Sequence, residues 1–148
     1  LRPTISYSVR IRPGGADITF IGAIRSGFKN YVNFQGRASR SAYWWWALFQ
    51  FIVEAATVLL AHLLAGANAM AGAGGLLIGV VALGLFLPSL GLYVRRLHDT
   101  NHSGWWIFLG CVPLVGGIVL LIWTILKGTA GPNKYGPDPL APDVTTVF

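Results

Sequence analysis

The chain has 148 residues, of which 54% are apolar and 11% are charged, and its formal net charge is +6. Soluble domains carry roughly 25% charged residues, so this composition excludes an ordinary soluble domain and favours a membrane protein. Nucleic-acid binding is not expected either, because the basic and aromatic residues lie beside long apolar runs, where anionic lipid headgroups are the nearer partner.

Residues 1–24 form an amino-terminal arm whose structure the pattern leaves open. Apolar and polar residues alternate over residues 5–12, as in a strand, and the Pro-Gly-Gly turn signal at residues 13–15 precedes a second apolar stretch over residues 18–24. The arm is therefore either a hairpin or a disordered segment, since an isolated hairpin is only marginally stable in water.

The next stretch, residues 25–40, predicts a short amphipathic helix in the membrane interface. Phe28, Tyr31 and Val32 share one helical face, while the positions between them include charged and amide side chains. Gly36 is expected to end this helix, because glycine is favoured just beyond the last turn.

Three long apolar runs follow, at about residues 43–64, 76–94 and 105–126. Each has close to the ~20 residues that an α-helix needs to cross the hydrocarbon core. Ser39 or Ser41 is expected to cap the first of these helices. We therefore predict an all-α membrane protein with about three transmembrane helices, preceded by the interfacial helix and the amino-terminal arm.

Pro88 and Pro113 are expected to kink the second and third of these helices. Pro113 leaves two topologies open, because the third run either crosses the membrane once or breaks there into a re-entrant hairpin. Its 22 residues make one comfortable span, so we predict three crossings within a membrane domain of residues 25–139. Residues 140–148 then form a tail.

The distribution of basic residues predicts the orientation. Seven of the eleven Lys and Arg residues precede Tyr43, and Arg95 and Arg96 lie between the second and third runs. Cytoplasmic segments are enriched in Lys and Arg, so the amino terminus and the Arg95-Arg96 loop are expected in the cytoplasm. The uncharged link over residues 65–75 is expected outside, and three crossings place the carboxyl terminus outside as well.

Aromatic residues lie where the predicted helices meet the membrane surface. Tyr43, Trp44 and Trp45 open the first run, and Trp105 and Trp106 open the third. Stacking on a ligand is one role for such clusters, but anchoring at the headgroup level explains them without any ligand.

Three ordered motifs carry a family resemblance. The first is FQGRASRSAYWW over residues 34–45, and the second joins Pro88 to RRLHDT at residues 95–100 and SGWW at residues 103–106. The third runs from Gly128 to Pro139 and includes Gly128, Gly131, Asn133 and YGPDP at residues 135–139.

Together the motifs cover about Gly27 to Pro139, and this part of the chain resembles the bacterial inner-membrane proteins catalogued as domain of unknown function 805. The resemblance implies an integral inner-membrane protein and brings no established activity. This chain has Ala42 where the family usually has an acidic residue, and His102 where the family usually has Arg or Lys.

Glu54 is the sharpest candidate for a functional group, because it lies at the middle of the first apolar run. A charged group at that depth costs at least ~2.5 kcal/mol on insertion scales, so it should face protein, water or a cation. His62 lies eight residues further on, on roughly the same helical face. The two residues either belong to a proton or cation path, or Glu54 is a protonated carboxyl that hydrogen-bonds to a neighbouring helix or subunit.

His98, Asp99 and His102 form a second constellation. The spacing of the two histidines suits a metal site on a helix, with Asp99 as a third ligand. However, residues 100–104 are typical of a loop, and the family resemblance implies a basic residue at position 102. We therefore expect His98 and Asp99 to be structural, with Asp99 either pairing with Arg95 or Arg96 or capping a helix, and we expect no metal.

Arg37, Arg40, Arg95 and Arg96 are expected at one membrane face. Guanidinium groups match phosphate oxygens, so these residues are expected to bind anionic lipid headgroups or a phosphate-bearing ligand. The alternative is that they only set the topology.

The sequence predicts a non-enzymatic function. It contains no phosphate-binding loop, nucleophile elbow, haem motif or zinc finger, so no cofactor and no catalytic residue is expected. The favoured hypothesis is an accessory or structural subunit that packs against a larger membrane complex or against itself. The alternative is an oligomeric transporter or channel with Glu54 in its pathway.

Overall fold

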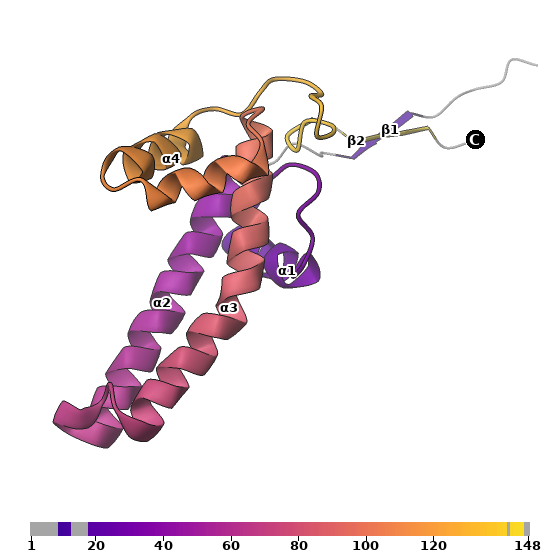
Figure 1. The fold of residues 1–148 in the computed structure, drawn as a ribbon. Coiled ribbons are helices and arrows are strands. Elements are labelled where there is room, and N and C mark those ends of the chain that lie inside the picture. Colours follow the sequence, from indigo (N-terminus) through magenta and orange to yellow (C-terminus); the bar gives the residue numbers. More distant parts are fainter. Residues whose placement is uncertain (1–8, 13–17, 142, 147–148) are drawn as a thin grey trace, which may run out of the picture.

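The computed structural model describes residues 9–12, 18–141 and 143–146. These residues form a helical protein (Figure 1) with the α-helices α1 Phe20–Lys29, α2 Arg40–Ala65, α3 Gly72–Asp99 and α4 Val115–Ile125, and the 3₁₀ helices η1 Gly66–Asn68 and η2 Gly104–Cys111. Two short strands, β1 Val9–Arg12 and β2 Asp143–Thr146, pair antiparallel. The predicted helical class is confirmed.

Two long antiparallel helices, α2 and α3, form the main body of the fold (Figure 1). Both are long and apolar enough to cross a membrane, α2 with η1 as Arg40–Asn68 and α3 as Gly72–Asp99. They contain the first two predicted runs and extend beyond them at both ends. Ser39 is the N-cap of α2, and its hydroxyl accepts a hydrogen bond from the Ala42 N–H at 3.2 Å. Ser39 was one of the two residues predicted to cap this helix.

Pro88 lies inside α3, where it cannot donate the backbone hydrogen bond that the Gly84 carbonyl would otherwise accept. The Tyr31 hydroxyl donates to that carbonyl instead, at 2.5 Å. A side chain from the loop after α1 thus satisfies the group that the proline leaves unpaired, and α3 continues through Pro88 as one helix.

The prediction that residues 105–126 form one helix is wrong. The run divides into η2 and α4 around Pro113, and Leu114 adopts a φ of +62° that reverses the chain direction. The 11 residues of α4 span about 16 Å, roughly half of the hydrocarbon thickness. Gly116 permits the close return, because a Cβ there would lie 1.7 Å from the Leu109 carbonyl oxygen.

The structure therefore has the hairpin that was the alternative topology. The η2–α4 pair lies across one end of α2 and α3 (Figure 1). The chain then returns to the carboxyl end of α3, where the Thr129 N–H donates to the Asp99 carbonyl at 2.8 Å. The segment after α4 consequently lies at the same end of the molecule as the Arg95-Arg96 pair, and not at the opposite end that three crossings require.

The amphipathic helix begins and ends earlier than predicted. Thr19 caps α1 through a hydrogen bond with the Gly22 N–H, and the helix ends at Lys29, so residues 30–39 form a loop. The apolar face of α1 packs against α2, with the ring centroids of Phe28 and Trp46 5.3 Å apart. Gly27 allows this approach, because a Cβ there would lie 2.1 Å from the Trp46 ring.

The amino-terminal arm pairs with the tail. Val9–Arg12 is a strand, as the alternation predicted, but its partner is Asp143–Thr146. Residues 18–24 begin α1 and do not form the second strand of a hairpin. The rest of the predicted hairpin, including its turn at residues 13–15, lies outside the described residues.

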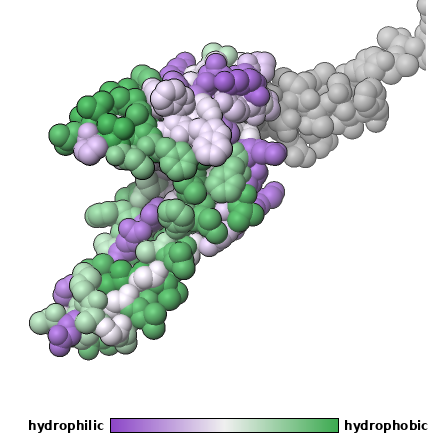
Figure 2. Space-filling model, in the orientation of Figure 1, coloured by the Kyte–Doolittle hydropathy of each residue, from purple (hydrophilic) through white to green (hydrophobic). Residues whose placement is uncertain are grey.

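The core lies where α1, the following loop, α2 and α3 meet. Its buried apolar residues are Ala38, Trp46, Leu85 and Leu92. Away from this core, α2, α3 and α4 expose large apolar side chains, which colour much of the α2–α3 pair and the α4 end green in Figure 2. Such an apolar surface is expected of helices that face lipid or a membrane partner.

Candidate functional site

A buried cluster of two arginines and one aspartate joins residues that are far apart in the sequence. Arg37 donates from Nε to Asp99 Oδ1 at 3.0 Å, and its Nη2 lies 2.9 Å from the same oxygen. Arg96 donates from Nη1 to the other carboxylate oxygen, Oδ2. All three side chains are at most 4% exposed, so little solvent screens these ion pairs.

The other N–H groups of these arginines bind the carboxyl-terminal segment. Arg37 donates to the carbonyls of Thr129 at 2.5 Å and Gly131 at 2.6 Å, and Arg96 donates to the carbonyl of Thr124 at 3.2 Å. The cluster therefore holds the segment after α4 against the ends of α2 and α3. All three motifs of the family resemblance meet here.

Close packing and a second carboxylate complete this arrangement. Gly128 lies against Asp99, and a Cβ at this position would be 2.1 Å from Oδ2. Asp138 accepts hydrogen bonds from the N–H groups of Leu140 at 2.9 Å and Gly131 at 3.0 Å. The hydrogen bond from Leu140 is the main cause that lowers the pKa of Asp138 below its usual range, and the bond from Gly131 adds to it.

The two histidines of the predicted constellation have separate partners. The His98 ring stacks on Tyr135 with centroids 3.8 Å apart, and its Nδ1 lies 3.1 Å from the Gly36 carbonyl oxygen. The His102 ring stacks on Trp123, with centroids 3.9 Å apart. Among the described residues, no three His, Cys, Asp or Glu side chains are grouped as metal ligands.

The four arginines that were expected to share one face occupy different environments. Arg37 and Arg96 are engaged in the buried cluster. Arg95 is 6% exposed, and its Nε donates to the Gly91 carbonyl at 3.3 Å. Its Nη2 is buried without a hydrogen-bond partner among the described residues. Arg40 is exposed.

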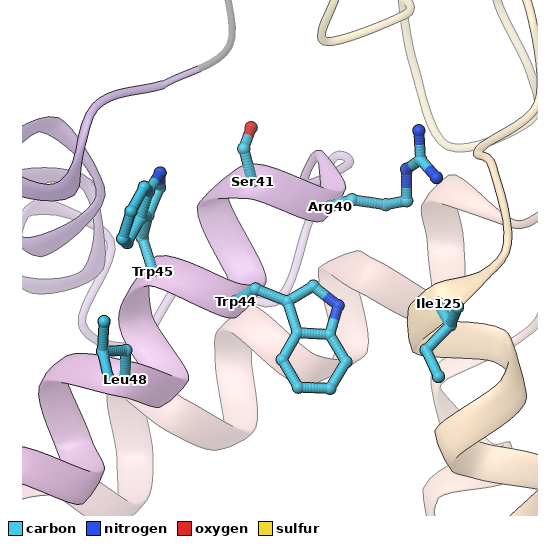
Figure 3. A pocket seen from close by; sticks show the side chains of 6 residues that line it. All are labelled: Arg40, Ser41, Trp44, Trp45, Leu48 and Ile125. Carbon is cyan, nitrogen blue, oxygen red and sulfur yellow. The ribbon is translucent and has the colours of Figure 1, made fainter.

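Arg40 lines a pocket of about 490 Å³ between the start of α2 and the end of α4. Figure 3 shows its guanidinium on the same side of the pocket as Ile125, with the indoles of Trp44 and Trp45 projecting from α2. Leu48 extends the apolar wall. A cation beside exposed indoles and aliphatic groups is typical of a residue set at the lipid headgroup level.

The remaining predicted anchors differ in exposure. Trp105 and Trp106 lie on η2 and are 78% and 49% exposed. Tyr43 packs between Trp44 and Tyr93, with ring centroids 5.5 Å from each. Tyr43 is therefore part of the contact between α2 and α3, whereas the two η2 tryptophans are on the surface.

A hydrogen-bond chain runs along the groove between α2 and α3. The Trp46 Nε1–H donates to Ser89 Oγ at 2.9 Å, and the Ser89 hydroxyl donates to Gln50 Oε1 at 2.6 Å. Gln50 Nε2 then donates to Glu54 Oε1 at 3.0 Å. These four residues line a pocket of about 390 Å³, and the half-buried Glu54 carboxyl group lies at the end of the chain.

His62 does not join this chain. Its Nδ1 lies 2.9 Å from the Val58 carbonyl oxygen of its own helix, and its side chain is exposed. Sequence reasoning missed Gln50 and Ser89. The position of Gln50 four residues before Glu54 was a usable signal, because such residues are neighbours on a helix. No pattern in the sequence indicated Ser89.

The fold and its surface define a helical membrane protein, with two helices long and apolar enough to cross a membrane and a hairpin at one end. The chain belongs to the family described as "Protein of unknown function (DUF805)", which matches residues 31–137. The resemblance of the three motifs is therefore confirmed, and the buried cluster lies within the matched residues.

Relatives locate the protein in the cell. The chain is 43% identical over 111 residues to the inner membrane protein YhaI of Escherichia coli strain K12, covering 75% of this chain and 89% of YhaI. It is 39% identical over 111 residues to the inner membrane protein YhaH of the same strain, covering 75% of this chain and 90% of YhaH. No solved structure matches the chain. The predicted bacterial inner-membrane location is confirmed.

Proposed function

We propose that this chain is a non-enzymatic accessory subunit that packs against a larger membrane complex or against another copy of itself. The observation that carries this proposal is the groove between α2 and α3, where a polar hydrogen-bond chain ends at the half-buried Glu54. A partner that covers this groove would complete its hydrogen bonding.

The position of Glu54 makes an uncovered groove unfavourable. Glu54 lies near the middle of α2, which extends from Arg40 to Ala65, so it is close to the bilayer centre when the helix crosses the membrane. A charged carboxylate there costs at least ~2.5 kcal/mol, and even the neutral acid needs a hydrogen-bond partner. Gln50 donates to Oε1, and Glu54 is one of the residues that line the pocket.

The apolar surface alone would not select a partner. Exposed residues on α2 and α3, including Phe51, Leu63 and Leu83, contact lipid as favourably as they contact another helix. Polar contacts between helices add specificity in a membrane, where each unsatisfied group is costly. The groove is therefore the surface best suited to recognise a specific membrane partner.

The basic end of the molecule is proposed to face the cytoplasm. Arg40, the Arg95-Arg96 pair, Lys127 and Lys134 lie at or beyond the ends of helices on the side where the segment after α4 returns. The positive-inside rule assigns this end, and with it the amino terminus, to the cytoplasm. The pocket of Arg40 and Trp44 would there anchor the chain among anionic headgroups.

A second candidate function is an oligomeric transporter or channel. The same hydrogen-bond chain favours this function. Polar side chains that lead to a carboxyl group inside a membrane are typical of proton or cation paths. In that case Glu54→Gln would abolish transport and leave folding intact. For an accessory subunit, the same change would weaken an assembly or have no effect.

Extraction of the protein from its native membrane in a mild, lipid-preserving detergent tests the proposal. The mass and composition of the extracted particle are expected to show a stoichiometric partner or a second copy. Glu54→Leu is expected to release that partner, and the control Leu63→Ala, on the exposed surface of α2, is expected to retain it. A wild-type particle containing one chain with lipid alone, or a partner that remains bound to Glu54→Leu, would contradict the proposal.

A further inference from the structure

A pocket separate from the groove lies at the basic end, between α1, the loop before α2, and α3. Its volume is about 280 Å³, and its lining includes Ser26, Ser39, Leu92, Arg95 and Leu140. Its walls thus combine two hydroxyl groups, apolar side chains and two buried guanidinium groups, those of Arg95 and of Arg37, which is already paired with Asp99.

Arg95 is the unusual member of this lining. The residue is 6% exposed, and Nη2 lies buried with no hydrogen-bond partner among the described residues. Native proteins rarely leave a buried donor unpaired, because no hydrogen bond then compensates for the loss of its hydration. The free-energy cost is larger for a charged group. Neither of the ion pairs formed by described residues includes Arg95.

The local charge balance also indicates that an anion is missing beside Arg95. Arg37, Arg95 and Arg96 place three shielded cations near one another, and Asp99 is the one buried carboxylate among the described residues. Both oxygens of Asp99 are already engaged with Arg37 and Arg96. Buried charges are ordinarily paired, so this end of the molecule lacks negative charge.

We infer that this pocket binds one phosphate group, with Arg95 Nη2 as its main charged donor and the hydroxyls of Ser26 and Ser39 beside it. A phosphate oxygen supplies the strong acceptor and the negative charge that the buried guanidinium needs. The phosphate belongs either to a lipid headgroup or to a free soluble anion, since the recognition chemistry is the same. This inference does not depend on the proposed function, because the groove and this pocket share none of the residues that carry the two arguments.

The test measures phosphorus bound to the full-length protein and the thermal unfolding of the delipidated protein. Two probes distinguish the sources, each added to the delipidated protein in a phosphorus-free detergent: inorganic phosphate and phosphatidylglycerol. The variant is Arg95→Gln, and the control is Lys29→Gln, at an exposed cation of α1. Chloride at matched ionic strength corrects for general salt stabilisation, which phosphate also produces.

The wild type and Lys29→Gln are expected to retain about one phosphate-bearing molecule per chain and to unfold at higher temperature when the probe is present. Arg95→Gln is expected to bind at least about tenfold more weakly, as the loss of a charge-assisted hydrogen bond implies. Arg95→Lys keeps the charge with fewer donors and is expected to bind with intermediate affinity, which covers the case that Arg95→Gln does not fold.

A lipid source is indicated when the retained molecule is a phospholipid that free phosphate does not displace. A soluble source is indicated when inorganic phosphate alone shifts the unfolding temperature; both results support the inference. Equal binding by the wild type and Arg95→Gln, or no binding by the wild type, would overturn it.

Asp17, which precedes the pocket residue Ile18 in the sequence, gives a further check. Phosphate binding that appears only in Asp17→Asn would mean that the chain's own carboxylate pairs with Arg95, and would also overturn it.

Discussion

Replacing Asp99 by asparagine removes the carboxylate that two buried guanidinium groups share. The side chains of Arg37 and Arg96 are 1% and 0% exposed, so water does not replace the lost charge. Removing one partner of a buried ion pair costs about 3–5 kcal/mol, because the remaining charge stays buried and uncompensated. We therefore expect Asp99→Asn to lower the free energy of unfolding by about 3–5 kcal/mol, a large part of a typical total of about 5–15 kcal/mol.

The assay is equilibrium unfolding in detergent micelles, followed by tryptophan fluorescence. The segment after α4 should also become sensitive to protease, because Arg37 and the Asp99 backbone both hold it in place. Asp138→Asn is the matched control, since Asp138 is a partly exposed carboxylate whose hydrogen-bond donors are backbone N–H groups. A loss below about 0.5 kcal/mol for Asp99→Asn, the range of ordinary surface changes, would refute this reasoning.

Three further predictions follow from other contacts. Gly27→Val should lower the free energy of unfolding by about 1–3 kcal/mol and separate α1 from α2, because the valine Cβ would lie 2.1 Å from the Trp46 ring. Unfolding by denaturant measures this loss, and an unchanged unfolding midpoint would contradict the prediction. A reporter fused after residue 148 should be on the same side of the membrane as one fused before residue 1; opposite sides would show that the third run crosses once. The lowered pKa of Asp138 means that its carboxylate stabilises the fold above its ordinary pKa of about 3.9, and that this contribution is lost as the pH falls through the lower folded value. Unfolding temperatures of wild type and Asp138→Asn should therefore converge at the lowest pH, and a constant difference would contradict the assignment.

The sequence predicted α2 and α3 well because their helical state depends on local properties. Long apolar composition and the Ser39 cap are readable from neighbouring residues, and both are present in the structure. The third run satisfied the same length criterion and was nevertheless predicted wrongly. Its reversal depends on Leu114 at positive φ and on the approach of Gly116 to the Leu109 carbonyl, and composition does not report such contacts.

The candidate site was predictable in its residues but not in its pairings. Asp99 is three residues from Arg96 and four from Arg95, so helical spacing permitted either pair. The structure selects Arg96 and adds Arg37, which lies 62 residues away, and it leaves Arg95 facing a different pocket. The motif residues were thus recognisable in the sequence. Which arginines pair with Asp99, and which one is left without a carboxylate, depends on the three-dimensional fold.

The most direct test of the central claim is photo-crosslinking from the groove in native membranes. A photoreactive residue at Ala82, which lines the groove on α3, should crosslink to one protein partner or to a second copy of the chain. The same residue at the neighbouring exposed position Leu83 should give mainly lipid adducts. A specific protein adduct from position 82 and its loss in Glu54→Leu are the predicted results. Lipid adducts alone from both positions would contradict the account.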